Sequence, residues 1–140
     1  MSLPAVLAPL FVQVVLTFGL LVCLAYQRVT LVRTGAVKRE DIALREPNWP
    51  PRAMQLQNAV SNQLELPVLF YVLTILSLVT RHADLLFVIL AWVFVLLRLV
   101  HAYIHVTDNE VRRRGLIFIS GATVLMVMWA IFIVRVLLGV

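Results

Sequence analysis

Four long apolar runs constrain the fold of this chain more than any other feature of its sequence. A helix that crosses a bilayer needs about 20 mostly apolar residues, and the expected spans cover residues 3–27, 53–80, 84–106 and 113–138. Hydrophobic residues make up 62% of the 140 residues and charged residues only 14%, against about 45–50% and 25% in soluble domains. We therefore expect one domain over residues 1–140, an all-α integral membrane four-helix bundle in contact with the lipid bilayer.

The second span is expected to be one continuous helix. Its apolar run "LPVLFYVLTILSLVT" is preceded by "RAMQLQNAVSNQLE", whose helical character extends the same helix outward. The turn "RHAD" that follows is short, so spans two and three should be antiparallel neighbours. Span four contains the small residues "SGAT", which suit close contact between helices.

Lysine and arginine are concentrated in two connections, which indicates the direction of the spans. The first connection and its flanks hold Arg28, Arg33, Lys38, Arg39, Arg45 and Arg52, and the third holds Arg112, Arg113 and Arg114. By the positive-inside rule both connections are cytoplasmic and both termini lie on the non-cytoplasmic side. We see no organelle signal, which favours a bacterial inner membrane. The positive charge then serves topology and anionic lipid contact rather than nucleic-acid binding.

The third span contains an unusual polar stretch, "RLVHAYIH". Arg98, His101 and His105 are spaced i, i+3 and i+7, which places them on one face of a helix. Arg98 lies about 13 residues into the span, roughly 20 Å from its outer end at 1.5 Å per residue. Since an arginine at such depth costs at least about 2.5–3.5 kcal/mol unless it is paired or hydrated, we expect Arg98 to have a partner.

A polar stripe in the second span offers that partner. Its members recur at helical spacing and are Gln55, Asn58, Asn62 and Glu65. Glu65 comes to about the same depth as Arg98, so we expect a Glu65–Arg98 ion pair, within one subunit or between two. These polar groups either fix the register of the bundle or line a water-accessible binding site, because intramembrane ionisable residues are functional candidates.

The common position of these residues favours a binding site. Asn62, Glu65, Arg98, the two histidines and Arg114 all converge on the cytoplasmic half of the bundle. A cavity there would collect an anionic ligand, with Arg114 and the N-terminus of span four facing it. No metal is expected, because zinc would need a third protein ligand beside the histidines and Glu65 is already used by Arg98.

These motifs resemble the family of membrane-associated proteins in eicosanoid and glutathione metabolism, which includes microsomal glutathione transferases and a prostaglandin E synthase. Arg98-x-x-His101-x-x-x-His105, followed nine residues later by Arg114, is similar to the Arg-x-x-His-x-x-x-Tyr and later Arg of the prostaglandin-synthase branch. The stretch "NQLELP" contains an Asn-x-x-Glu similar to that of the family's second helix. The resemblance covers nearly the whole chain.

The resemblance implies a homotrimer that binds glutathione between subunits, near the cytoplasmic side. It implies a catalytic role for Arg114, because a nearby guanidinium favours the glutathione thiolate. The implied ligand-binding residues are Asn62, Glu65, Arg98, His101 and His105, and Asn58 of the same polar stripe is a further candidate.

Three positions depart from the family pattern. Asn58 and Ser61 stand where the family has an arginine in the second helix, and His105 replaces a tyrosine. One cation for glutathione is therefore missing. Arg28 or Arg33, at the end of the first span, would be able to supply it.

Two classes of function stay open on these observations. The first is a glutathione-transferase-like membrane enzyme that conjugates or reduces a lipophilic small molecule, an electrophile arriving from the bilayer. The alternative is a non-catalytic protein of the same fold that binds lipid or acts as a scaffold or accessory subunit, which the missing arginine favours. A small-drug exporter is disfavoured because the first span offers only Gln13 and Thr17 and no proton-coupling carboxylate.

Overall fold

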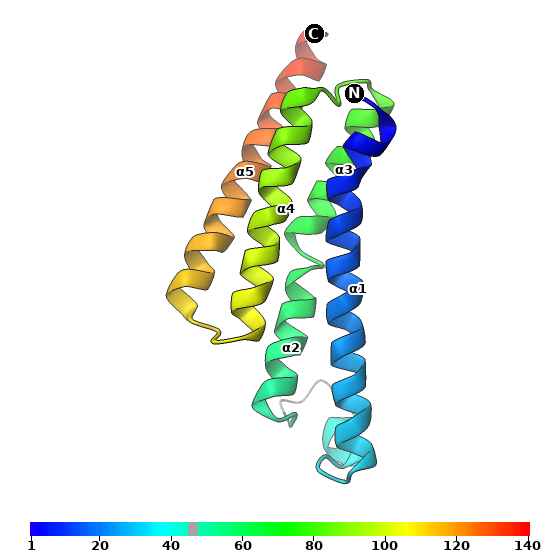
Figure 1. Cartoon of the computed structure of the whole chain (residues 1–140), viewed down its shortest axis with the longest axis vertical. Coiled ribbons are helices and arrows are strands. Elements are labelled where there is room, and N and C mark those ends of the chain that lie inside the picture. Colours follow the sequence, from blue (N-terminus) through cyan, green and yellow to red (C-terminus); the bar gives the residue numbers. More distant parts are fainter. Residues whose placement is uncertain (45–47) are drawn as a thin grey trace.

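The chain folds into a bundle of long helices. The computed structural model describes residues 1–44 and 48–140, and no strand occurs among them. The elements are α1 (Leu3–Arg33), the short 3-10 helix η1 (Arg39–Ile42), α2 (Pro51–Asn62), α3 (Leu66–Val79), α4 (Leu85–Val106) and α5 (Val111–Leu138). Figure 1 shows both termini at one end of the bundle and the α1–η1 and α4–α5 connections at the other end. The expected all-helical class is confirmed.

Four helical segments are long and apolar enough to cross a membrane. They are Leu3–Arg33, Pro51–Val79, Leu85–Val106 and Val111–Leu138. The first segment continues beyond the expected end at residue 27, because neither glycine nor proline interrupts it before Gly35, whose φ of 79° follows the C-cap Thr34. The described residues thus contain four candidate membrane spans, the number expected from the sequence.

The second span is interrupted, so the expected continuous helix over residues 53–80 is wrong. Helix α2 ends at Asn62, α3 begins at Leu66, and a turn at residues 63–65 lies between them. Pro67 explains the break, because its nitrogen has no hydrogen to donate and its ring would clash with the carbonyl four residues earlier. The break lies beside α1, about midway along the bundle (Figure 1).

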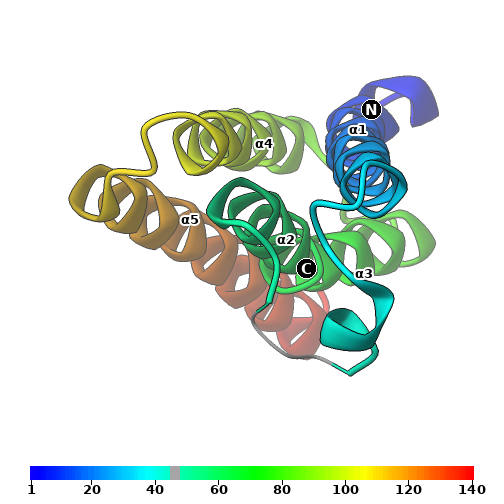
Figure 2. The same cartoon turned by 90° about the horizontal axis from the view of Figure 1, so that it is seen from below.

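The larger of two apolar core clusters occupies the half of the bundle that carries the termini, and a smaller one joins α1, α2 and α4 nearer the other end. Phe70 and Leu73 of α3 and Phe94 of α4 are completely buried, and the ring centroids of Phe70 and Phe94 lie 4.9 Å apart. Val6 of α1 and Leu125 of α5 belong to the same cluster. Helix α4 connects the bundle, because it packs against α1 on one side and α5 on the other (Figure 2) and also contacts α2.

The turn between α3 and α4 is tied to the end of α5 by Asp84. Its Oδ1 accepts a hydrogen bond from the Phe87 backbone N–H at 2.9 Å, which caps α4, and its Oδ2 lies 2.6 Å from Nη1 of Arg135. Burial acts to raise the pKa of Asp84. The hydrogen bonds from Phe87 and Arg135, together with the charge of Arg135, outweigh burial and hold that pKa below its usual value.

We expect Asp84→Asn to remove a pH-dependent part of the stability while keeping the helix cap, because asparagine caps helices as well as aspartate does. A carboxylate whose pKa is lowered by folding stabilises the protein above its unfolded-state pKa, about 3.9, and loses that effect as the pH falls through the folded-state value. The melting temperatures of the two proteins should differ at pH 7 and converge at acidic pH, once the pH is below the folded-state pKa of Asp84. The ion pair is half-exposed, so the difference should be small; a gap that is equally large at both pH values would contradict this role.

Candidate functional site

Arg98, His101 and His105 lie on one buried face of α4. Their relative exposures are 1%, 2% and 5%. The rings of His101 and His105 are nearly perpendicular, at 82°, with centroids 5.5 Å apart. Phe118 of α5 packs against His101 with ring centroids 5.7 Å apart. The three polar side chains therefore form one cluster, closed by an aromatic ring on the α5 side.

Arg98 is bound by Asn62 at the end of α2. Its Nη2 donates to the Asn62 backbone oxygen at 3.2 Å and to the side-chain Oδ1. Its Nε and Nη1 are buried and have no hydrogen-bond partner among the described residues. Because a buried charge is costly unless it is paired and hydrogen-bonded, these two N–H groups are donors suited to an anionic ligand.

The expected Glu65–Arg98 ion pair does not form within the chain. None of the ion pairs among residues 1–44 and 48–140 joins the two, although Glu65 is close enough to attract Arg98 electrostatically. The physical reason is the break after α2, where Glu65 is exposed and precedes the first residue of α3. An ion pair between two subunits stays a prediction.

The two imidazoles are also incompletely hydrogen-bonded. Nδ1 of both His101 and His105 is buried and lacks a partner among the described residues. Arg98 and Arg114 are each close enough to His101 and His105 to act on them electrostatically. The buried cluster and the nearby Arg114 thus bring two guanidiniums close to the imidazoles, a set that suits an anion. In the described part of the chain, no group of three or more His, Cys, Asp or Glu residues could hold a metal ion.

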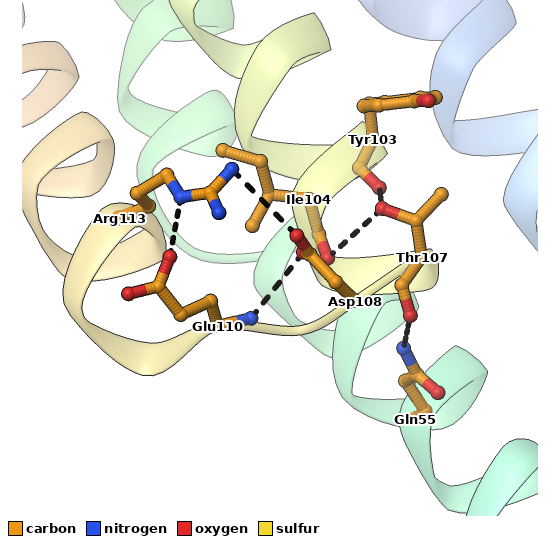
Figure 3. Close-up of polar contacts among 7 residues, drawn as sticks. All are labelled: Gln55, Tyr103, Ile104, Thr107, Asp108, Glu110 and Arg113. Carbon is orange, nitrogen blue, oxygen red and sulfur yellow. Dashed lines mark hydrogen bonds and ion pairs between the residues drawn. The ribbon is translucent and has the colours of Figure 1, made fainter.

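The turn between α4 and α5 gives neighbouring arginines different surroundings. Arg113 donates through Nε to Glu110, and its Nη1 lies 3.7 Å from Oδ2 of Asp108 (Figure 3). Arg114 donates instead to the neutral side chain of Asn109. No ion pair among the described residues includes Arg114. Its charge, in the first turn of α5, is therefore available to a ligand.

The polar stripe of α2 divides between two faces. Gln55 turns toward α4, where its Nε2 donates to the backbone oxygens of His105 and Thr107 at 2.7 and 3.1 Å (Figure 3 shows the Thr107 contact). Asn62 also turns toward α4, as its contact with Arg98 shows, whereas Asn58 and Glu65 are exposed. The predicted site residues therefore form a buried cluster and a separate exposed face of α2.

The exposed face of α2 lines a cavity of about 940 Å³. Arg28 of α1 reaches this cavity, where its guanidinium carbon lies 4.7 Å from the ring centroid of Trp49 and its Nη2 donates to Gln57. The polar residues that line the cavity are Arg28, Gln57, Asn58, Ser61 and Glu65, and the apolar part of the wall includes Ile42, Leu44, Met54 and Leu64. Arg28, one of the two residues expected to supply the missing charge, thus lies beside the positions where α2 lacks it.

A buried amide pair is absent from the residues predicted from the sequence. Gln13 of α1 and Gln63 at the break are 0% and 1% exposed, and Gln13 Nε2 donates to Gln63 Oε1 at 2.9 Å. The signal in the sequence is Gln13 itself, an amide in an otherwise apolar part of the span. A buried amide needs a hydrogen-bond partner, so Gln13 predicts a polar contact without indicating which residue makes it.

These features define a class of protein: an integral multi-pass membrane protein of four helical spans, with a buried cluster of cationic and imidazole groups near the end that carries its basic connections. The model of the MAPEG family matches residues 6–134, and the chain belongs to this family of membrane-associated proteins in eicosanoid and glutathione metabolism. The resemblance seen in the sequence is thus confirmed. Comparisons with curated proteins and with solved structures gave no match.

Proposed function

We propose that this protein is a homotrimeric membrane enzyme of the glutathione-transferase type, which conjugates or reduces lipophilic electrophiles arriving from the bilayer. The observation that carries the proposal is Arg98, a guanidinium that is only 1% exposed and has two N–H groups without a partner among the described residues. Glutathione has two carboxylates and a thiol, and charge-assisted hydrogen bonds from a guanidinium to a carboxylate are among the strongest in proteins. MAPEG membership, which covers catalytic and non-catalytic proteins, is consistent with this activity.

The residues of the buried cluster have distinct proposed roles. Arg98 binds a carboxylate of glutathione, Asn62 holds Arg98 in place, and His101 and His105 donate hydrogen bonds to the peptide. Arg114 stabilises negative charge on sulfur, because a nearby cation lowers the pKa of a thiol. Glutathione supplies the thiol that is transferred.

The exposed face of α2 would complete the site from a second subunit. Asn58, Ser61 and Glu65 are exposed in the single chain, although they lie within the second span. Hydrocarbon does not solvate amides or carboxylates, so this face requires a neighbouring subunit or water between subunits. Arg28 adds a cation at this face. A homotrimer with ligand sites between its subunits would cover the exposed polar groups of α2 and would also complete the ligand site.

The distribution of charge gives the proposed orientation. Both basic connections lie at the same end of the bundle (Figure 1), which by the positive-inside rule is the cytoplasmic end. The site then takes glutathione from the cytoplasm, and both termini lie on the other side. We propose the bacterial inner membrane as the location.

One observation favours the alternative of a non-catalytic trimer that binds lipid or serves as a scaffold or accessory subunit. Asn58 and Ser61 leave the cavity-facing side of α2 without a cation of its own, and Arg28 is partly occupied by Gln57 and Trp49. If Arg28 does not replace the cation that α2 lacks, glutathione would bind too weakly for turnover.

We expect glutathione to raise the melting temperature of the purified protein in detergent or nanodiscs. A ligand that binds only the folded state stabilises it by RT ln(1 + [L]/Kd), about 2.7 kcal/mol at a hundred times Kd. Millimolar glutathione should therefore shift the thermal transition upward, whereas free cysteine, which has the thiol but neither the γ-glutamyl nor the glycyl residue and only one carboxylate, should not. A folded protein whose transition does not move with millimolar glutathione would contradict the proposed function.

A further inference from the structure

The break in the second span is held by two other helices. On one side Arg98 of α4 donates to the backbone and side-chain oxygens of Asn62. On the other side Gln13 of α1 donates to the side chain of Gln63, the next residue, at 2.9 Å. Two buried polar side chains from separate helices therefore bind consecutive residues at the point where α2 ends. The Asn62 contact belongs to the site described above, whereas the Gln13 contact lies outside it.

The hydrogen bonds of the break show that it is a defined structure. The Gln63 backbone N–H bonds to the oxygen of Val60 at 3.0 Å rather than to that of Ala59. The Ala59 oxygen accepts instead from Gln63 Nε2 at 3.1 Å, and the oxygen of the same Gln63 amide accepts from Gln13. Within a membrane every backbone oxygen released by a broken helix needs a new donor. The side chain of Gln63 supplies that donor for the Ala59 oxygen, and Gln13 holds the side chain of Gln63 in position.

The break decides where two candidate ligand residues point. In a continuous helix, residues three apart such as Asn62 and Glu65 would share one face. Across the turn, Asn62 contacts Arg98 while Glu65 is exposed and lines the 940 Å³ cavity with Asn58. The geometry of the turn thus sets the relative positions of the Asn62–Arg98 pair and the Glu65 carboxylate.

We infer that Gln13 is a positioning residue for the ligand site. Its side-chain amide donates to Gln63 rather than to a residue of the buried cluster, and it does not line the cavity. It acts by holding Gln63, and through Gln63 the turn that orients Asn62 and Glu65. This inference rests on the proposed function, because the ligand whose affinity it controls is glutathione.

The first test compares glutathione affinity in Gln13→Leu with that in a matched control. Leucine is similar in size but cannot donate to Gln63, and a misplacement of about 1 Å in an active site can lower its reaction rate about a hundredfold. We expect the glutathione Kd of Gln13→Leu to rise at least about tenfold, measured well below the melting temperature of both proteins. Thr74→Val removes an equally buried hydroxyl, whose bond to the Phe70 oxygen lies within α3, and should leave Kd unchanged.

A second variant keeps the test valid if Gln13→Leu does not fold. Gln13→Asn retains the amide but shortens its reach by one methylene, so it should give a smaller rise in Kd with a normal yield of folded protein. An unchanged Kd in a folded Gln13 variant would overturn the positioning role and leave the proposed function standing.

The orientation of residue 65 can be followed without glutathione. In a Cys23→Ser background, which removes the one native thiol, Glu65→Cys places a thiol at an exposed position of the turn. We expect Gln13→Leu to change its rate of reaction with a water-soluble maleimide severalfold, and Thr74→Val to leave the rate unchanged. If Gln13→Leu changes the maleimide rate but the wild type does not bind glutathione, only the proposed function is refuted. If the maleimide rate is the same in the Glu65→Cys protein with no further change, with Gln13→Leu and with Thr74→Val, the positioning role is refuted.

Discussion

Arg98→Met should abolish the stabilisation by glutathione and at the same time raise the melting temperature of the ligand-free protein. Arg98 is a buried cation whose bound partner, Asn62, is neutral, and its remaining two donor atoms have no partner among the described residues. An arginine in a membrane span costs at least about 2.5–3.5 kcal/mol unless it is paired or hydrated, and we expect this cost to exceed what the hydrogen bonds from Nη2 to Asn62 return. A stability gain combined with a loss of binding is typical of a residue retained for its ligand.

Thermal unfolding with and without millimolar glutathione measures both effects in one experiment. Arg98→Lys serves as a comparison, because lysine keeps the charge but has one donor nitrogen where the guanidinium has three. Its glutathione shift should be intermediate between those of the wild type and Arg98→Met. If Arg98→Met bound glutathione as tightly as the wild type, or if it unfolded at a lower temperature, Arg98 would be a structural residue.

Arg114→Ala should reduce thiol transfer by about 100- to 1,000-fold, the usual cost of removing one group that stabilises charge in a transition state. The assay follows transfer of glutathione to a chloronitrobenzene, in which the sulfur replaces chloride on the ring. The loss should appear mainly in kcat, because Arg98 and the histidines hold the rest of glutathione.

Arg113→Ala is the matched control for this prediction. Arg113 adjoins Arg114 in the sequence but its guanidinium contacts Asp108 and Glu110 in the turn (Figure 3). Its removal should leave kcat almost unchanged. Equal losses in Arg113→Ala and Arg114→Ala would mean that the charge of the turn, rather than Arg114, supports the reaction.

Much of the fold was predictable because one physical requirement dominates it. A bilayer demands about 20 apolar residues for each crossing, and this chain separates such runs with Gly, Pro and charged residues. The buried face of α4 was predictable for a related reason. Arg98, His101 and His105 repeat at helical spacing in an otherwise apolar run, and polar groups of that kind must turn away from lipid.

The break at residues 63–65 was the main error, and it also accounts for the lack of a Glu65–Arg98 ion pair within the single chain. Polar residues at helical spacing continue up to Glu65, so the pattern favours one helix, whereas the backbone follows the constraint of Pro67. The contacts of Gln13 with Gln63 and of Arg28 with Trp49 join segments distant in the chain. Such pairings depend on how the helices pack, which periodicity within one segment does not specify.

The most direct test is a cryo-electron microscopy map of the protein in lipid nanodiscs with millimolar glutathione. We predict a homotrimer with a tripeptide between subunits, a carboxylate on the guanidinium of Arg98 and the sulfur nearest Arg114. A lipid headgroup or only water beside these two arginines, or glutathione bound elsewhere, would contradict the proposed function.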